Sequence, residues 1–337
     1  MTRPRITLAC RNLDGTTAIF RGQVALPGIE LDAREENNPP KMFQSFFQGE
    51  YDVSEMSLAE SVYYISRSKA DFIGVPVFPS RVFRHSFLFC RPGSDVSPDS
   101  LRGRRFAFER WVQTAGVWQR GILVDELDVD PAGAEWHAVS LHHWHDEAEQ
   151  PLQPRDGFSI RLLPPALAGD AHPYASMFAG LREDRLDVIG TTEGQSGSMT
   201  SLASSGEVRR VFPDYQEVEA TYYQKTGNHP IMHVLMMRRS VAERYPELPA
   251  ALFRMFCESK RIGLQLSQAV PSYALAWKHR WFEEEQAALK DDAWSHGLVR
   301  NQHTLATFLR YCYTQGVCDR VMEPKELFHL STWDLVE

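Results

Sequence analysis

Hydrophobic residues along the first ninety positions alternate between two spacings. Short apolar runs at 6–10, 29–31 and 71–77 are flanked by polar loops and have the length of buried strands. Between them, apolar side chains recur at helical spacing over 42–47 and 58–65. Strands that alternate with helices predict a mainly parallel sheet with helices on its faces.

The same alternation returns in a second block of the chain. A strand is predicted over 105–108, and a helical pattern follows from Thr114. A helix and then a strand are predicted again within 174–193. After a turn at Pro230, the run IMHVLMM predicts a further strand, and the chain beyond Ser240 is mostly helical.

This order of elements predicts an α/β protein with two lobes, two interlobe crossings and a helical C-terminal region. We expect one lobe to combine residues 1–90 with 225–337, and the other to span 91–224. The crossings fall near 86–92 and 222–233. A cleft between lobes is a favoured place for a small ligand, so polar side chains near the crossings are the first candidates for a site.

The charge distribution of the 337-residue chain narrows the range of partners. The net charge is −8 and no block is rich in lysine or arginine, so nothing indicates a nucleic-acid surface. The longest apolar runs are far too short to span a bilayer, and the N-terminus has no apolar core of signal-peptide length. The five cysteines are scattered and form no Cys-x-x-Cys pair. We therefore expect a cytoplasmic protein with free thiols and no membrane or nucleic-acid partner.

The segment FPSRVFRHS, residues 78–86, places two arginines and a histidine between two apolar runs at the first crossing. Arg81 and Arg84 each carry the planar fork of donors that grips a carboxylate through two hydrogen bonds. His85 can donate a proton or bind a phenol, and Ser86 adds a hydroxyl for the same ligand. The alternative is a polar turn in which one arginine is solvated and the other pairs with an acid.

Two predicted helix starts supply further candidates, one in each lobe. In YDVSEMS, a short strand expected over 51–53 leads to Glu55 and Ser57, where unsatisfied backbone N–H groups attract anions. In WVQTAGVW, Thr114 begins a second possible anion-binding site, and Trp111 can pack against an aromatic ring of the ligand. The alternative is structural in both places, with Ser57 and Thr114 as helix caps and the tryptophan in the core.

Histidines form two more groups. His229 precedes a proline, so it lies in an extended or turn segment and is expected to face the cleft. His233 follows in a predicted strand, and we count it among the ligand-binding candidates. HHWHDE, residues 142–147, is rich in metal-ligand types, but its spacing matches no established metal motif and we expect a polar loop. The sequence therefore predicts no metal site, and it leaves open the alternative that this segment binds a metal that assists a reaction.

Four segments of the chain, taken together, resemble one family. YDVSEMSLAES, IGVPVFPSRVFRHS, LRGRRFAFERWVQTAGVWQRGIL and TGNHPIMHVLMMRRSV resemble the 4,5-dihydroxyphthalate decarboxylase family and occur in the order expected for it. The resemblance covers about residues 5–270. It implies a fold like that of the type II periplasmic-binding proteins. Two shorter segments, LRGRRFAF and REDRLDVIGTTE, are similar to characteristic segments of that fold.

Two segments depart from the pattern of this family. Residues 137–153, HAVSLHHWHDEAEQPLQ, stand where relatives carry a glycine-rich loop. Residues 187–194, DVIGTTEG, stand where relatives often have an alanine-rich strand that ends in arginine. Both segments are expected at the cleft, so the resemblance implies an aromatic acid substrate without identifying its ring substituents.

The resemblance implies a carboxy-lyase of aromatic-compound catabolism that needs no cofactor. A ring hydroxyl pushes electrons toward the carbon that bears the carboxylate, an acid protonates that carbon, and carbon dioxide leaves. Candidates for the acid are His85, Glu55 and His229. Candidates for binding the substrate are Arg81, Arg84, Ser57, Ser86, Trp111, Thr114 and His233.

An alternative from another class is a cytoplasmic solute-binding protein that captures a small organic acid without chemistry. The same fold supports either function, because a fold does not determine an activity. The sequence leaves assembly into a homo-oligomer open.

Overall fold

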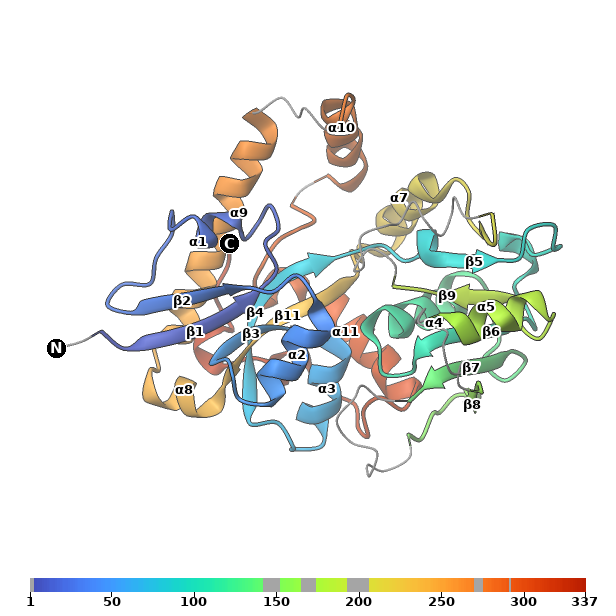
Figure 1. The fold of residues 1–337 in the computed structure, drawn as a ribbon, viewed down its shortest axis with the longest axis horizontal. Coiled ribbons are helices and arrows are strands. Elements are labelled where there is room, and N and C mark those ends of the chain that lie inside the picture. Colours follow the sequence, from blue (N-terminus) through green and yellow to red (C-terminus); the bar gives the residue numbers. More distant parts are fainter. Residues whose placement is uncertain (1–2, 142–151, 165–173, 193–205, 270–274, 291) are drawn as a thin grey trace.

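The computed structural model describes residues 3–141, 152–164, 174–192, 206–269, 275–290 and 292–337. Two sheets lie side by side in it, each covered by helices (Figure 1). No helix within the described ranges has the length and apolar character needed to cross a membrane.

The first sheet has the strand order β2-β1-β3-β11-β4. Its strands are β1 (Arg5–Cys10), β2 (Glu30–Glu35), β3 (Val53–Ser57), β4 (Phe72–Arg81) and β11 (Ile231–Arg238). The strands are parallel except β11, which lies antiparallel between β3 and β4. The predicted parallel arrangement is therefore correct apart from the strand that returns late in the chain.

The second sheet has the order β10-β5-β9-β6-β7-β8. Its strands are β5 (Leu88–Cys90), β6 (Arg105–Arg110), β7 (Glu135–Ser140), β8 (Arg161–Leu162), β9 (Val188–Gly190) and β10 (Arg209–Arg210). Here β5 is the strand that runs against its neighbours. In each sheet, the reversed strand is thus the one that the chain enters directly after crossing from the other sheet.

Helices cover the faces of both sheets and fill the space between them (Figure 1). In the first part of the chain they are α1 (Thr17–Phe20), α2 (Pro39–Phe47), α3 (Leu58–Ser66), α4 (Thr114–Glu126) and α5 (Ala175–Arg182). Those of the C-terminal part are α7 (Tyr215–Thr226), α8 (Arg239–Arg244), α9 (Leu248–Ala269), α10 (Lys278–Leu289) and α11 (Leu298–Thr314). The helical C-terminal region predicted from the sequence is present.

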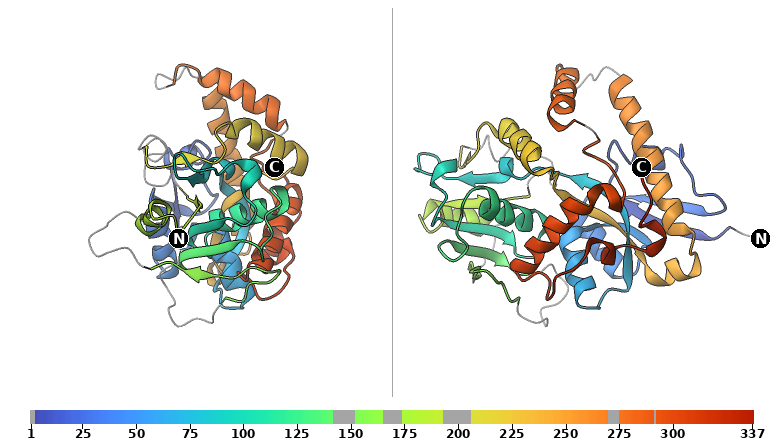
Figure 2. Two further views of the ribbon diagram at one scale, coloured as in Figure 1. Left: turned by 90° about the vertical axis from the view of Figure 1, so that its right-hand side faces the viewer. Right: turned by 180° about the vertical axis from the view of Figure 1, so that it is seen from behind.

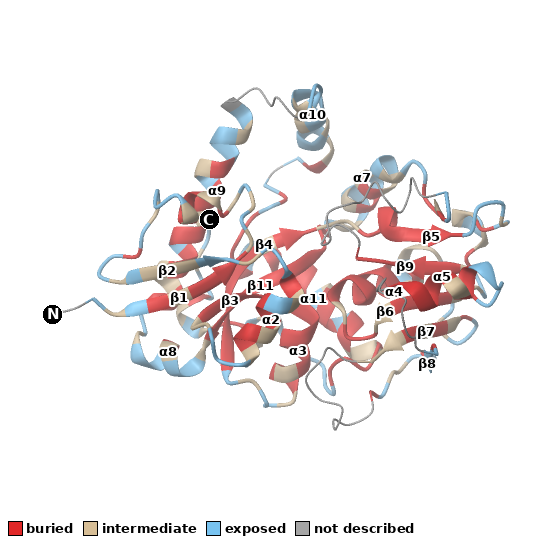
Figure 3. Ribbon diagram, viewed as in Figure 1, coloured by how far each residue is buried: buried red, intermediate tan, exposed pale blue. Residues whose placement is uncertain are grey.

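One buried hydrophobic cluster joins the two sheets, and the burial pattern is continuous across their boundary (Figure 3). The cluster includes Phe46 and Val62 beside the first sheet and Trp118 and Phe308 beside the second. Helix α11 runs along the back of this boundary (Figure 2) and packs on α4, with the rings of Trp118 and Phe308 5.3 Å apart. The two sheets therefore share this cluster, and each sheet also has a separate hydrophobic cluster of its own.

Two strands are longer than the apolar runs predict. Strand β4 continues through the FPSR segment to Arg81, whose backbone pairs with Ile231 of β11. Strand β3 begins at Val53 and reaches Ser57, so Glu55 lies within a strand and not in the first turn of a helix. The polar side chains at the ends of these strands are buried, because groups from distant segments satisfy their hydrogen bonds. Local sequence patterns do not reveal such partners.

We predict that Gly121→Ala destabilises the protein even though alanine favours helix formation. A Cβ at this position of α4 would lie 2.3 Å from ring carbons of Tyr311 in α11. Overpacking of this kind costs about 1–3 kcal/mol, to be measured as a lower free energy of unfolding in urea. Gly15→Ala is the control, because its new Cβ would meet Lys260 at ordinary contact distances of 3.8 Å and more. Equal stability of both variants would contradict the close packing of α4 on α11.

Candidate active site between the two sheets

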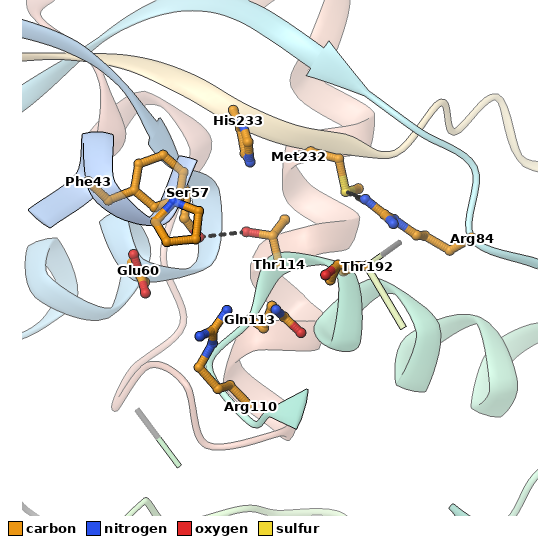
Figure 4. Close-up of a pocket in the computed structure, with 12 residues that line it drawn as sticks. Phe43, Ser57, Glu60, Arg84, Arg110, Gln113, Thr114, Thr192, Met232 and His233 are labelled. Atoms are coloured by element: carbon orange, nitrogen blue, oxygen red, sulfur yellow. Dashed lines mark hydrogen bonds between the residues drawn. The ribbon is translucent and has the colours of Figure 1, made fainter. Parts of the chain in front are cut away.

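A pocket opens where the two sheets face each other, and it receives side chains from both (Figure 4). Its lining from the first sheet and its helices comprises Pro40, Phe43, Ser57, Glu60, Met232 and His233. Its lining from the second sheet and its helices comprises Arg110, Gln113, Thr114, Ala115 and Thr192. Arg84 reaches the pocket from the first crossing. Such an interlobe position was expected, and polar groups converge on it from segments far apart in the sequence.

Arg84 is a buried cation at the edge of this pocket. Its guanidinium Nε lies 3.1 Å from the sulfur of Met232, which Nη2 also contacts, and its face covers the Phe87 ring at 5.0 Å. A thioether is a weak acceptor, so these contacts satisfy a guanidinium poorly. Burial lowers the pKa of Arg84 to about 9, which leaves the side chain charged at neutral pH. The arrangement suits an anionic ligand.

Glu60 brings an acid to the same pocket from the first turn of α3. Burial raises the pKa of this carboxyl group to about 8, against an opposing effect of the nearby Arg110 charge. At neutral pH the side chain is therefore mostly protonated and can donate a proton. Glu60 is not among the residues singled out from the sequence. An acid in the first turn of a helix ordinarily has a structural explanation, because it interacts favourably with the helix dipole. The available signal was its place in LAESVYYIS, whose neighbouring positions are nearly all apolar or small.

Glu55 has the opposite character, although it is equally buried. Its carboxylate accepts hydrogen bonds from Arg11 Nη2 at 2.6 Å and from the Arg11 backbone N–H at 3.0 Å, and it lies 2.6 Å from His233 Nδ1. Burial alone would raise the pKa of Glu55, but Arg11 and His233 more than offset this and hold it far below its usual range. Glu55 is therefore ionised at neutral pH.

The ion pair between Glu55 and Arg11 determines the protonation state of His233. Burial and the Arg11 charge lower the pKa of the imidazole, against the opposing pull of Glu55, so the ring is neutral at pH 7. Because the ionised Glu55 accepts at Nδ1, that nitrogen carries the proton. Nε2 is then the acceptor of the ring, and the side chain lines the pocket (Figure 4).

A hydrogen-bonded link crosses the pocket at the start of two helices. Thr114 Oγ1, at the N-terminus of α4, accepts from the backbone N–H of Ala59 and lies 2.9 Å from Ser57 Oγ (Figure 4). Ser57 occupies the N-cap position of α3 without making a side-chain cap. The two hydroxyls predicted as anion ligands are thus brought together, and here they join the two sheets.

Arg110 is the second guanidinium of the pocket. It ends strand β6, directly before the turn into α4, and its Nη1 lies 3.3 Å from Glu109 Oε1. Its buried Nε has no hydrogen-bond partner within the described part of the chain. The second segment that departs from the family pattern also reaches the pocket, through Thr192, whose hydroxyl bonds that of Tyr174 at 2.9 Å.

Arg81 and His229 lie together outside this pocket, and Arg81 Nη1 donates to the His229 carbonyl at 3.1 Å. The Arg81 guanidinium donates to Asn301 Oδ1 at 2.5 Å and to the Ser295 carbonyl at 2.8 Å. His229 Nδ1 is 3.0 Å from the Ala293 carbonyl, and its ring stacks on Phe83 with centroids 4.6 Å apart. Both side chains are held by the loop before α11, and they line a separate groove beside α7 and α10.

His85, Ser86 and Trp111 also lie away from the pocket lining. His85 packs against Phe212 and Tyr222, and burial lowers its pKa to about 4. The backbone N–H of Ser86 donates to Glu219. Trp111 is buried and donates from Nε1 to the carbonyl of Gln315 at 2.7 Å, in the core position considered as the alternative.

Within the described parts of the chain, no three His, Cys, Asp or Glu side chains are grouped so that they could hold a metal ion. The histidine-rich segment 142–147, expected to be a polar loop, falls outside the described residues.

No family model matches the chain. Over 335 residues it is 28% identical to a protein of Comamonas testosteroni named 4,5-dihydroxyphthalate decarboxylase, and this match covers 98% of the chain and 97% of that protein. A protein of the same name from Pseudomonas putida is 26% identical over 137 residues, which are 40% of this chain and 53% of the other.

The fold is shared with solved structures of low sequence similarity. The periplasmic aliphatic sulphonate-binding protein SsuA of Escherichia coli aligns with a TM-score of 0.52 and 11% identity, over 97% of this chain and 98% of that one. This likeness confirms the predicted fold class. The chain is thus similar over nearly its whole length to 4,5-dihydroxyphthalate decarboxylase and has a periplasmic-binding-protein-like fold, which confirms the resemblance carried by its four motifs.

Proposed function

We propose that the protein is a decarboxylase that acts on a hydroxylated aromatic acid in the pocket between the two sheets. One observation carries the proposal: the pocket holds both a buried guanidinium, Arg84, and a buried carboxyl group with a pKa of about 8, Glu60. The first suits a carboxylate of the substrate, and the second can supply the proton that replaces the departing carboxylate. The name shared by the two relatives supports this class of reaction.

Substrate binding is assigned to groups that reach the pocket from three directions. Arg84 binds a carboxylate that stays on the ring, because its guanidinium otherwise contacts only a thioether and an aromatic face among the interactions of the described residues. Phe43 and Met232 provide apolar walls for the ring. Arg110 and the first turn of α4 face the ring from the second sheet and favour negative charge there.

The proposed reaction uses His233 and Glu60 in opposite roles. His233 Nε2 takes the proton of a ring hydroxyl, and the electron pair released moves into the ring toward the carbon that bears the leaving carboxylate. Glu60 protonates that carbon. The bond to the carboxylate carbon then breaks, its electron pair restores the aromatic ring, and carbon dioxide leaves. His233 returns its proton to the phenolate, Glu60 is reprotonated from solvent, and one proton is consumed overall.

Glu60 suits the donor role better than the three candidates chosen from sequence. Glu55 is ionised by Arg11 and His233, so it has no proton to give, but it orients the His233 ring. His85 and His229 are neutral at pH 7 because burial lowers their pKa values to about 4 and about 3, and neither lines the pocket. These two residues are therefore left outside the proposed mechanism.

We predict that Glu60→Gln lowers kcat by about 10²–10⁴-fold, because the amide fills the same space but cannot transfer the proton. Turnover is measured as carbon dioxide release from a panel of hydroxyphthalates and hydroxybenzoates, and binding is measured separately. Glu219→Gln is the matched control, because burial also raises the pKa of Glu219, which lies outside the pocket. Substrate binding without turnover by the unmodified protein would refute the decarboxylase.

The pH dependence of stability gives an independent test of the Glu60 environment. Its pKa is about 8 in the folded protein against an ordinary value of 4.5, so the folded state binds more protons across that window. The free energy of unfolding contributed by this group therefore falls as pH rises from about 4.5 to about 8. Glu60→Gln removes this pH dependence, so its Tm relative to that of the unmodified protein should rise between about pH 4.5 and pH 8. A Tm difference independent of pH in scanning calorimetry would contradict the raised pKa.

We predict that Arg84→Met lowers kcat/KM by about 10²-fold or more, since one member of a buried charge pair typically contributes about 2–5 kcal/mol. The fold should survive, because methionine spares the protein a buried charge. Arg84→Lys keeps the charge without the planar fork of donors, so its kcat/KM should lie between those of Arg84→Met and of the unmodified protein. Steady-state kinetics of all three forms, each checked for Tm, decide the matter: near-native kcat/KM in Arg84→Met would remove this residue from the site.

A further inference from the structure

Arg120, in the second turn of α4, is fully buried, and the mechanism above does not use it. Its Nε donates to Gln315 Oε1 at 2.8 Å and its Nη2 to the Trp111 carbonyl at 2.6 Å. The guanidinium also lies over two rings, 3.9 Å from the centroid of Trp111 and 4.9 Å from that of Phe108. Its Nη1 has no hydrogen-bond partner among the residues that the structure describes.

Every group that contacts this guanidinium among the described residues is neutral. Burial lowers the pKa of Arg120 to about 9, which still leaves it charged at pH 7. A buried cation without an acid is costly, and apolar residues of similar volume often replace such groups without loss of stability. These neutral contacts do not by themselves explain why the side chain at this position is charged, whereas a negative charge nearby would.

The position of the guanidinium identifies where that charge would lie. A Cβ built on Gly116 would be 2.9 Å from Arg120 Nη1 and 3.5 Å from the Arg110 carbonyl, so the guanidinium occupies the space beside the first turn of α4. The two residues before Gly116, Thr114 and Ala115, line the pocket. The positive charge thus lies within about one helical turn, ~5.4 Å, of the pocket wall, behind the helix N-terminus that faces the ligand.

The same contacts hold the turn that carries the second-sheet side of the pocket. Arg120 binds the carbonyl of Trp111, whose Nε1 donates to the Gln315 carbonyl at 2.7 Å. The Gln315 side chain in turn donates to the Val117 carbonyl at 3.0 Å. Gln315 directly follows α11, so a C-terminal residue fixes the turn between Arg110 and Thr114 from behind.

We infer that Arg120 is a positioning and specificity residue, which selects ligands that carry two negative charges by adding a buried positive charge behind the N-terminus of α4. It does not touch the ligand; it acts through the helix start and through the Arg110 turn. The inference rests on the proposed function only in placing the ligand in this pocket. With Arg84 and Arg110, it makes three guanidinium groups around a pocket whose acid, Glu60, is mostly uncharged at pH 7.

The test compares two probes that lack a ring hydroxyl and so are not turned over by the proposed route: phthalate, with two carboxylates, and benzoate, with one. Calorimetric titration at one fixed salt concentration gives the ratio of their affinities. Arg120→Met should lower the preference for phthalate over benzoate by about tenfold, because the second charge loses an attraction of that order. Its Tm should fall modestly, because the Gln315 side chain and the Trp111 carbonyl each lose a buried donor.

Three further variants separate this role from a structural one. Arg120→Lys should restore part of the preference for phthalate. Gly116→Ala should reproduce the loss without removing the arginine, because its Cβ displaces the guanidinium. Arg67→Met is the matched control: Arg67 also stacks on an aromatic ring, Tyr63, at 3.9 Å, but it pairs with Asp319 away from the pocket, so the preference should not change.

An unchanged preference for phthalate in Arg120→Met and in Gly116→Ala would overturn the inference. So would an equal loss in Arg67→Met, because the effect would then follow from disturbed packing. Phthalate binding that depends on Arg120, in a protein that decarboxylates none of the hydroxylated acids, would support the inference while refuting the proposed reaction. The two proposals therefore fail separately.

Discussion

The antiparallel insertion of β11 between β3 and β4 is the constraint on which the site depends. This strand returns from the second crossing and brings His233 beside Glu55, and Met232 beside Arg84. It also presents the Ile231 carbonyl to Trp118 Nε1 at 3.0 Å, which ties α4 to the first sheet. A single strand thus contacts Glu55 beside the pocket, Arg84 in the first crossing and Trp118 in α4. Loss of its register would move all three at once.

Burial has opposite consequences for the two glutamates near the pocket, and the contrast organises its chemistry. Glu55 lies beside Arg11 and His233, which together outweigh the cost of burying its charge. At Glu60, only five residues later, burial outweighs the opposing effect of the Arg110 charge and favours the neutral form. One carboxylate therefore orients a histidine while the other retains a proton at neutral pH. Environments that push the pKa values of two similar groups apart are a common way to assign acid and base roles within one site.

The C-terminal helices are part of the site's support although they do not line the pocket. Asn301, in the first turn of α11, binds Arg81 at the end of β4, and Gln315, after the same helix, binds Trp111 and Arg120 next to the second sheet. Helix α11 is therefore attached to both sheets and fixes their separation. The Ser57–Thr114 hydrogen bond makes a further link on the pocket side. A pocket supported on both sides in this way is suited to holding reacting groups at fixed distances.

The sequence by itself determined the alternation of strands and helices and the two-sheet fold class, because hydrophobic spacing and motif order are local properties. Among the residues that it singled out, Arg84, Ser57, Thr114 and His233 lie at the pocket. Only the tertiary structure decided that Arg81 and His229 turn to the loop before α11, that Glu60 lines the pocket, and that Arg120 lies behind the helix start beside it. The reason is physical: the state of a buried charge depends on partners such as Arg11, His233 and Gln315, which are distant in sequence and are brought together by folding.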